Sequence, residues 1–157
     1  FDISSTSGEN YDLVIEGGWT DDFAYRAYNI PSVLDGSGIT GSTAEGGVLS
    51  LSASGSSAFG LDGVTVRNGS ATEAGGGVYI RGGRDVVFSN NIVENNASAV
   101  EGGGAYLESM SGTVWAYNNL IENNDAVSLG GGLTAKAGGS SGGVYLYTNV
   151  VRGNTAP

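Results

Sequence analysis

The chain contains no cysteine and no histidine among its 157 residues. The lack of cysteine excludes disulfides, iron–sulfur ligation and thiol catalysis, although it leaves the cellular compartment open. The lack of histidine excludes a Ser-His-Asp triad and any metal site built on imidazole. Most of the familiar catalytic constellations are therefore not available to this protein.

Basic residues are also scarce, with 6 Lys and Arg against 16 Asp and Glu, which gives a formal net charge of −10. An acidic surface disfavours nucleic acid and anionic membranes as partners. No apolar run approaches the length of a membrane span. We therefore expect no nucleic-acid partner and no membrane insertion by this segment.

Glycine, in contrast, is abundant and periodic. Three glycine triplets and one weaker copy each precede a short apolar segment, and their last glycines are Gly47, Gly77, Gly104 and Gly132. These glycines are 30, 27 and 28 residues apart. Self-similarity at such a period is typical of a solenoid, in which each repeat forms one coil and buries its apolar face against its neighbours.

A second repeated block follows each glycine segment, at residues 86–96, 114–124 and 144–154, with a degenerate copy at 59–69. The four copies align without a gap. All variation in repeat length falls between the glycine segment and this block. Insertion at a single corner indicates that the other corners of successive coils are stacked in register.

Apolar residues alternate along the block, which is the pattern of half-buried strands, and no helical period of useful length is present. We predict an all-β parallel β-helix of about four to five coils of 27–30 residues, each with three short strands. In this fold Asn91, Asn119 and Asn149 would stack at one corner. Their amides would bond along the column, and asparagine tolerates the left-handed backbone that we expect there.

The chain reads as one domain, residues 1–157, in which 46–157 form regular coils. Residues 1–45 read as an irregular first coil with a loop excursion at 17–31. The sequence begins without an initiator Met, and no clear cap follows the last block. We expect a fragment or unit of a longer or assembled protein, whose terminal strand edges favour self-association or docking of neighbouring subunits or domains.

The recurring glycine strands, the Asn-Asn corners and the segment Phe88-Ser89-Asn90-Asn91 resemble the right-handed parallel β-helix repeats of the pectate-lyase-like superfamily. The nearest type is the polymorphic outer-membrane protein repeat. The resemblance is good over 46–157 and loose over 1–45. It implies a right-handed solenoid in a secreted or cell-surface protein. It says little about activity, because the same fold hosts lyases, hydrolases, adhesins and fibres.

Asp21 and Asp22 form the only adjacent acid pair, and they lie in the excursion. Carboxylates in a loop suit Ca²⁺, so these two residues are a candidate Ca²⁺ site, although a solvated loop is the favoured explanation. No cofactor is otherwise required.

Glu94 and Glu122 would lie one coil apart in a single column, a spacing that resembles the carboxylate pair of retaining glycosidases. The column continues with Arg67 on one side and Arg152 on the other. Arginines that flank the pair favour a structural charge ladder, because they offset the repulsion between the carboxylates.

The outward positions of the blocks hold aromatic residues. Trp115, Tyr117, Tyr145 and Tyr147 would form a two-by-two group on one sheet, and Tyr79 and Tyr106 a smaller outward pair on the glycine strands. Exposed aromatics with polar groups suit sugar stacking or a protein contact. Packing against corner loops, or strand propensity alone, explains them as well.

These features favour a non-catalytic, extracellular structural or adhesive β-helix module that contacts a partner protein or polysaccharide through its outward aromatics. Such a module also suits assembly into a surface fibre or filament. The alternative is a fragment of a polysaccharide-active enzyme, either a lyase or a glycoside hydrolase.

Overall fold

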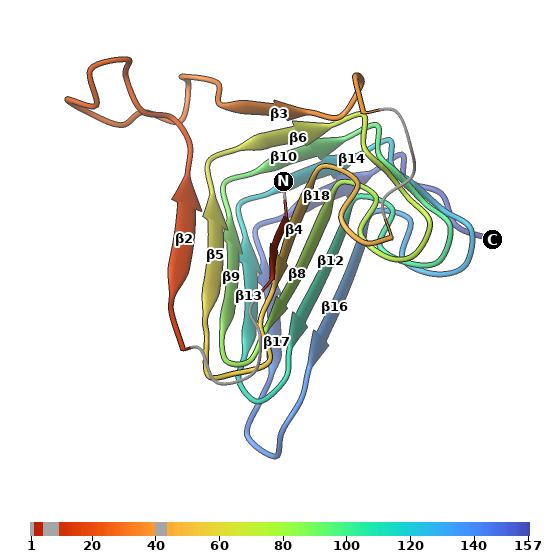
Figure 1. Cartoon of the computed structure of the whole chain (residues 1–157). Helices are drawn as coiled ribbons and strands as arrows, with labels where there is room; N and C mark the ends of the chain where they lie inside the picture. The colour runs from red at the N-terminus through yellow and green to blue at the C-terminus, as the bar shows by residue number, and fades with distance from the viewer. Residues whose placement is uncertain (1, 5–9, 40–43) are drawn as a thin grey trace.

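The computed structural model describes residues 2–4, 10–39 and 44–157. These residues form strands and turns, and none of them belongs to a helix that is long and apolar enough to cross a membrane. Parallel strands stack as a β-solenoid of about four turns, as the view along the coils in Figure 1 shows. The predicted parallel β-helix is confirmed.

Three sheets form the main walls of the solenoid. The glycine sheet follows the glycine triplets and contains β1 (Asp2–Ser4), β4 (Leu49–Ser52), β8 (Val78–Gly82), β12 (Ala105–Ser109) and β16 (Leu133–Ala137). The aromatic sheet contains β2 (Leu13–Glu16), β5 (Phe59–Asp62), β9 (Val86–Ser89), β13 (Val114–Tyr117) and β17 (Val144–Tyr147). The charged sheet contains β3 (Val33–Asp35), β6 (Thr65–Arg67), β10 (Ile92–Glu94), β14 (Leu120–Glu122) and β18 (Val150–Arg152).

A fourth, smaller sheet closes the side between the charged sheet and the glycine sheet. It consists of two-residue strands, β7 (Ser70–Ala71), β11 (Ala97–Ser98) and β15 (Asp125–Ala126). Three strands per coil thus describe the main walls, and the short strand adds one more parallel pairing where the chain returns to the next glycine triplet.

The core is a set of apolar columns that run along the solenoid. Val86, Phe88, Val93 and Ile121 are fully buried, and their neighbours on each strand point outward. Since strand pairing puts Val86 beside Val114 and Phe88 beside Ala116, each coil covers the core of the one before it. This stacking explains why a coil that is too small to bury its own apolar face is stable within the array.

The predicted asparagine column stands at the corner between the aromatic and charged sheets. The Oδ1 atom of Asn119 accepts a hydrogen bond from the backbone N–H of Asn91 at 2.9 Å, and Asn149 Oδ1 accepts one from the backbone N–H of Asn119 at 3.1 Å. The left-handed backbone, however, belongs to the preceding residues, with φ of 57° at both Asn90 and Asn118. The expectation that the column residues themselves adopt this conformation is wrong, because their side chains point inward to bond the coil.

A second asparagine column, which the sequence reasoning missed, stands at the next corner. Asn124 Oδ1 accepts from the Asn96 amide at 3.0 Å, and Asn154 Oδ1 accepts from the Asn124 amide at 2.9 Å. Asn95 and Asn123 precede these residues and take the positive φ here. Two corners of the coils that contain β9, β13 and β17 are therefore held by stacked asparagine side chains.

The glycine triplets allow close backbone packing at the corner between the short strands and the glycine sheet. Gly102 has a φ of +65°, and a Cβ atom on Gly103 would lie 2.2 Å from the carbonyl oxygens of Asp125 and Gly131. A side chain at Gly103 would therefore push successive coils apart.

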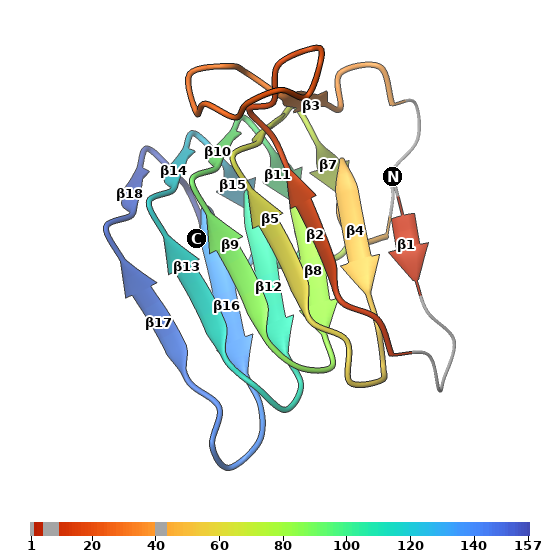
Figure 2. The same cartoon turned by 90° about the vertical axis from the view of Figure 1, so that its left-hand side faces the viewer.

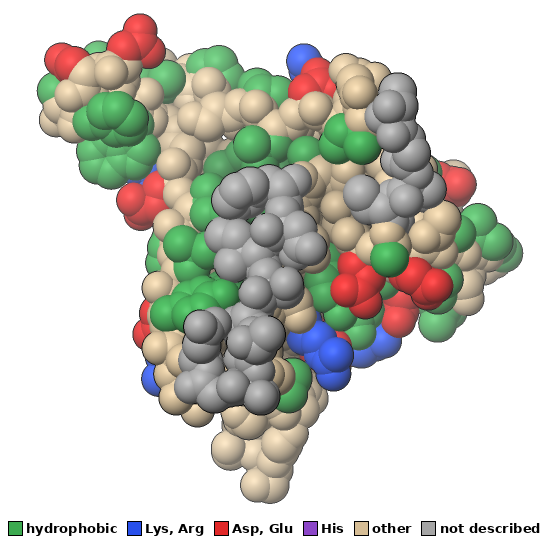
Figure 3. Space-filling model, viewed as in Figure 1, with side chains coloured by type: hydrophobic (Ala, Val, Ile, Leu, Met, Phe, Trp, Pro, Cys, Tyr) green, Lys and Arg blue, Asp and Glu red, His purple; other side chains and the backbone are tan. Residues whose placement is uncertain are grey.

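The corner after β2 carries a projecting loop, seen at the upper left of Figure 1. β2 pairs with β5 and β3 pairs with β6, so the chain leaves the wall after Glu16 and returns to it at Val33. Within the loop, Trp19 and Arg26 form an antiparallel bridge. Hydrophobic and acidic side chains gather on this projection in Figure 3.

Candidate functional site

The outer face of the aromatic sheet, turned toward the viewer in Figure 2, is the candidate functional site. Two outward columns run across its five strands. The first column consists of Val14, Gly60, Val87, Trp115 and Tyr145, and the second consists of Glu16, Asp62, Ser89, Tyr117 and Tyr147. Both columns change character along the solenoid, from small or acidic residues near β2 to aromatic residues near β17.

The four aromatic residues lie together as expected. Trp115 stacks on Tyr145 with ring centroids 4.4 Å apart and planes within 13°, and Tyr117 stacks on Tyr147 at 5.3 Å and 5°. Tyr145 and Tyr147 are about half exposed, at 50% and 46%. Because the rings stack from coil to coil, they cover one another's faces and present edges and hydroxyls outward. The group is suited less to a sugar lying flat on it than to a contact with ring edges.

Tyr79 and Tyr106 also stack, at 5.1 Å and 8°, on the outer side of the glycine sheet. Their exposure is only 5% and 7%, and they pack with Ala74 in a small cluster of their own. Burial raises the pKa of both hydroxyls. The pair points outward as expected but is not exposed, because the rings stack on each other and pack against Ala74, and Lys136 Nζ lies 4.9 Å from the centre of the Tyr106 ring.

An apolar notch opens in the first outward column, where Gly60 has no side chain. Val14 and Val87 border it, and Asp12, Asp62 and Asp85 stand at its rim. Val14 is 60% exposed, whereas the core residues Phe59 and Leu61 beneath are buried. The face therefore combines a depression with acidic edges near β5 and a raised aromatic group near β17.

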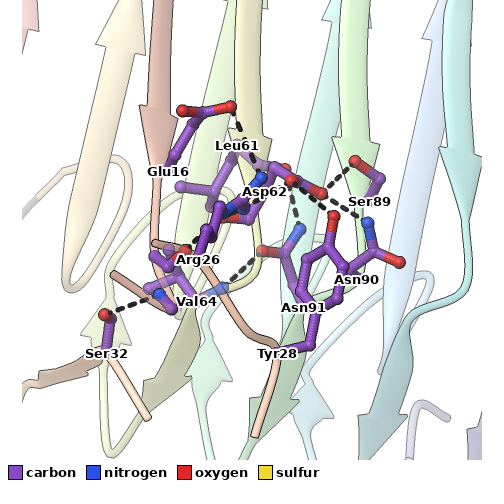
Figure 4. A network of polar contacts seen from close by, with 12 residues as sticks. Glu16, Arg26, Tyr28, Ser32, Leu61, Asp62, Val64, Ser89, Asn90 and Asn91 are labelled. Atoms are coloured by element: carbon purple, nitrogen blue, oxygen red, sulfur yellow. Dashed lines mark hydrogen bonds and ion pairs between the residues drawn. The ribbon is translucent and has the colours of Figure 1, made fainter. Parts of the chain in front are cut away.

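A polar network joins the projecting loop to the edge of this face (Figure 4). Asp62 Oδ1 accepts hydrogen bonds from Ser89 at 2.5 Å and Asn90 at 2.6 Å, and Asp62 Oδ2 lies 2.5 Å from Arg26 Nη2. Burial alone would raise the pKa of Asp62, but the bonds from Ser89, Asn90 and Arg26 outweigh it and lower the pKa.

Arg26 holds the loop through further contacts. It donates to the carbonyl oxygens of Gly17 at 2.6 Å and Asp62 at 3.0 Å, and its guanidinium lies 4.9 Å from the centre of the Tyr28 ring. The network was not foreseen, because it joins an insertion to a repeat strand and no local pattern marks it. Its saturated hydrogen bonding suits a rigid anchor for the loop.

Asp21 and Asp22 lie exposed in the same loop. Asp22 Oδ1 accepts from the Thr20 hydroxyl at 2.6 Å and the Ala24 amide at 3.1 Å, and these bonds lower its pKa. In the described part of the chain, no group of three or more acids is arranged to hold a metal ion. The two residues build a tight turn here, and a Ca²⁺ site at them stays a prediction.

The charged column has the predicted register, with Asp35, Arg67, Glu94, Glu122 and Arg152 side by side. Arg152 Nε lies 2.6 Å from Glu122, and Arg67 Nε lies 2.8 Å from Asp35 rather than from Glu94. On the glycine sheet, Arg81 Nε lies 3.2 Å from Glu108. The carboxylates are thus distributed along ladders of opposite charge.

In a comparison with protein families, residues 24–156 match the family described as the right-handed β-helix region. This match covers most of the chain and agrees with the handedness that the resemblance implies. Comparisons with curated proteins and with solved structures give no match.

Proposed function

We propose, since the chain belongs to the right-handed β-helix family, that it is a non-catalytic structural and adhesive module of an extracellular or cell-surface protein. Its role is to hold side chains on a rigid wall for contact with a partner. The observation that carries this proposal is the stacked, half-exposed aromatic group formed by Trp115, Tyr117, Tyr145 and Tyr147.

The physical case rests on the cost of exposing such a group. Tyr145 and Tyr147 leave about half of their surface in water, and Trp115 and Tyr117 are partly exposed beside them. Contiguous apolar patches of this kind usually mark interaction sites. Aromatic side chains with a polar end dominate binding energy at protein interfaces. A partner that covers the ring edges and accepts bonds from the hydroxyls would use both properties.

Assembly into a filament is part of the same proposal. The last coil exposes Val144, Leu146 and Val151 at 40%, 53% and 54%, in columns that are fully buried in earlier coils. The charged column has Arg152 at this end and Asp35 at the other. A neighbour stacked on this end would therefore cover apolar residues and place opposite charges side by side.

The alternative, a polysaccharide lyase or glycoside hydrolase, receives no specific support from the geometry. Glu94 and Glu122 are adjacent on the charged sheet, but Arg152 Nε lies 2.6 Å from Glu122, so this carboxylate is already engaged in an ion pair of the charge ladder. Polysaccharide remains a candidate partner for binding rather than for cleavage.

The test replaces Trp115→Ser and Tyr145→Ser together. Because neither side chain points into the core, the fold should be kept, while association weakens by about 30-fold or more, the loss of about 2 kcal/mol typical of interface aromatics. Pull-down on insoluble pectin, cellulose and chitin measures glycan binding, and sedimentation measures self-association. The control is Val127→Ser with Leu129→Ser, which removes exposed apolar side chains elsewhere. Unchanged glycan binding and unchanged association in the aromatic variant would overturn the proposal.

A further inference from the structure

We infer that the outer face of the aromatic sheet binds the same face of a second copy of this chain, about a two-fold axis that runs along the strands at β9. This inference names the partner for the proposed contact surface and rests on that proposal. The support is a complementarity between the two ends of the face. An interface of this kind is closed, so it produces dimers rather than fibres.

A rotation about such an axis keeps each residue's position along its strand and reverses the order of the coils. In the first outward column it brings Trp115 opposite Gly60 of the second copy and Tyr145 opposite Val14, while Val87 meets its own equivalent. The largest side chain of the column thus faces the residue that has none. The apolar notch between Val14 and Val87 is the hole that receives the ring.

The second outward column is complementary in hydrogen bonding where Tyr147 meets Glu16. The same rotation brings these two residues opposite each other and places Ser89 at the axis. It also places Tyr117 opposite Asp62, whose oxygens are already bonded to Ser89, Asn90 and Arg26. Within the described residues, the hydroxyls of Tyr117 and Tyr147 donate no hydrogen bond. Glu16 is 43% exposed and its nearest cation, Arg26 Nη1, is 3.4 Å away, so it retains capacity to accept. A phenol hydroxyl and a carboxylate make a strong pair when water is excluded.

The other two-fold arrangement, with its axis along the solenoid, fits poorly. It would place Trp115 against Tyr117 and Tyr145 against Tyr147, so large rings would meet large rings. The notch at Gly60 would face Asp62 and stay empty. Of the two, the reversed arrangement fills the depression with a ring and supplies Glu16 as an acceptor for the Tyr147 hydroxyl.

The projecting loop extends the same contact. It stands out beyond the face at one corner in Figures 1 and 3, and its side chains Phe23, Tyr25 and Tyr28 are 75%, 62% and 62% exposed. The network at Asp62 holds the base of the loop rigidly. The reversed coil order brings the partner's loop beside the corner between β17 and β18, where Val150 is 51% exposed.

Cross-linking tests this geometry directly, since the chain has no cysteine of its own. Val87→Cys places one thiol at the axis. Facing sheets pack about 10 Å apart, so a short bismaleimide spans the pair. We expect a covalent dimer for Val87→Cys and at least tenfold less for the control Val127→Cys, which lies away from this face. A mixture of Gly60→Cys and Trp115→Cys chains should link to each other faster than either chain links to itself.

A hole-filling variant separates this inference from the broader proposal. Gly60→Leu leaves the core strands intact, because a Cβ atom there meets no backbone and only the exposed Val14 side chain, at 3.2 Å from both methyl groups and 3.6 Å from Cβ, so Val14 has to shift by a few tenths of an ångström. In sedimentation it should weaken dimerisation at least tenfold while circular dichroism is unchanged. If Val87→Cys links no more than Val127→Cys, the two-fold dimer is wrong. Loss of glycan binding in the Trp115→Ser, Tyr145→Ser variant would then still support the proposed function.

Discussion

The buried asparagine column offers the sharpest test of what holds the coils together. Asn119 is 2% exposed and serves three partners. Its Oδ1 accepts from the Asn91 amide at 2.9 Å, and its Nδ2 donates to the Phe88 carbonyl and to Asn149 Oδ1, both at 2.9 Å. Asn119→Ala removes all three bonds at once.

The expected cost follows from the groups that lose a partner. Asn91 is 1% exposed and Phe88 is fully buried, so water cannot replace the lost bonds. A buried backbone amide without a partner costs about 1–3 kcal/mol, and this cost falls on the Asn91 amide. The Phe88 carbonyl lies in the paired ladder of β9 and β13, so its share of the loss is smaller. A loss of about 1–3 kcal/mol is a sizeable share of the roughly 5–15 kcal/mol by which a domain is stable.

Urea unfolding followed by circular dichroism measures this loss, and hydrogen exchange at the Asn91 amide locates it. The matched control is Asn149→Ala, the same change in the same column at the half-exposed last coil. Since water reaches that coil, we expect about 1 kcal/mol there. The column does not carry the stability assigned to it if the free energy of unfolding of Asn119→Ala lies within 0.5 kcal/mol of that of the unmodified chain, which is about the accuracy of such measurements. The same holds if Asn119→Ala lowers the free energy of unfolding by less than Asn149→Ala does.

Three further outcomes follow from the structure. Asp62→Asn should lower stability at pH 7 by about 1–3 kcal/mol, because charged hydrogen bonds are lost. Since the folded pKa of Asp62 is depressed, the stability that Asp62 contributes is present above the unfolded pKa and is lost as pH falls through the folded pKa. The stability of the variant should therefore fall less than that of the unmodified chain on acidification below about pH 4. Gly103→Ala should prevent folding or cost more than about 3 kcal/mol, whereas Gly38→Ala, where a Cβ meets nothing within 4 Å, should be neutral in the same urea titration. Glu94→Gln should leave folding and dimerisation within twofold of the unmodified chain by sedimentation, and a loss of glycan cleavage in this variant would revive the enzymatic alternative.

The repeat made the register of the coils predictable. Because the blocks align without a gap, the pairing of Glu94 with Glu122 and the column of Asn91 and Asn119 follow directly from sequence positions. The second column was missed although Asn96 and Asn124 have the same spacing. A repeated position shows that residues stack, but it does not show whether the side chain points into the coil or away from it.

Two other features were beyond the reach of the pattern. Alternation placed Tyr79 and Tyr106 on the outer side of their strands, but their burial against Ala74 involves a residue outside the strand pattern. The contact between Arg26 and Asp62 joins an irregular insertion to a repeat strand 36 residues away. Contacts of this kind depend on how the chain returns to the wall, which periodicity does not encode.

The charged sheet poses the strongest objection to a dimer through the aromatic face. The same reversal of coil order would bring Asp35 opposite Arg152, so the charged column also pairs opposite charges. Its central residue, Glu94, would however meet its own equivalent, and like charges at the axis repel. Arg152 is already paired within the chain, and exposed ion pairs contribute only about 0–1 kcal/mol each. Placing Trp115 over Gly60 removes apolar surface from water without breaking an existing bond, so the aromatic face is the one that gains free energy by pairing.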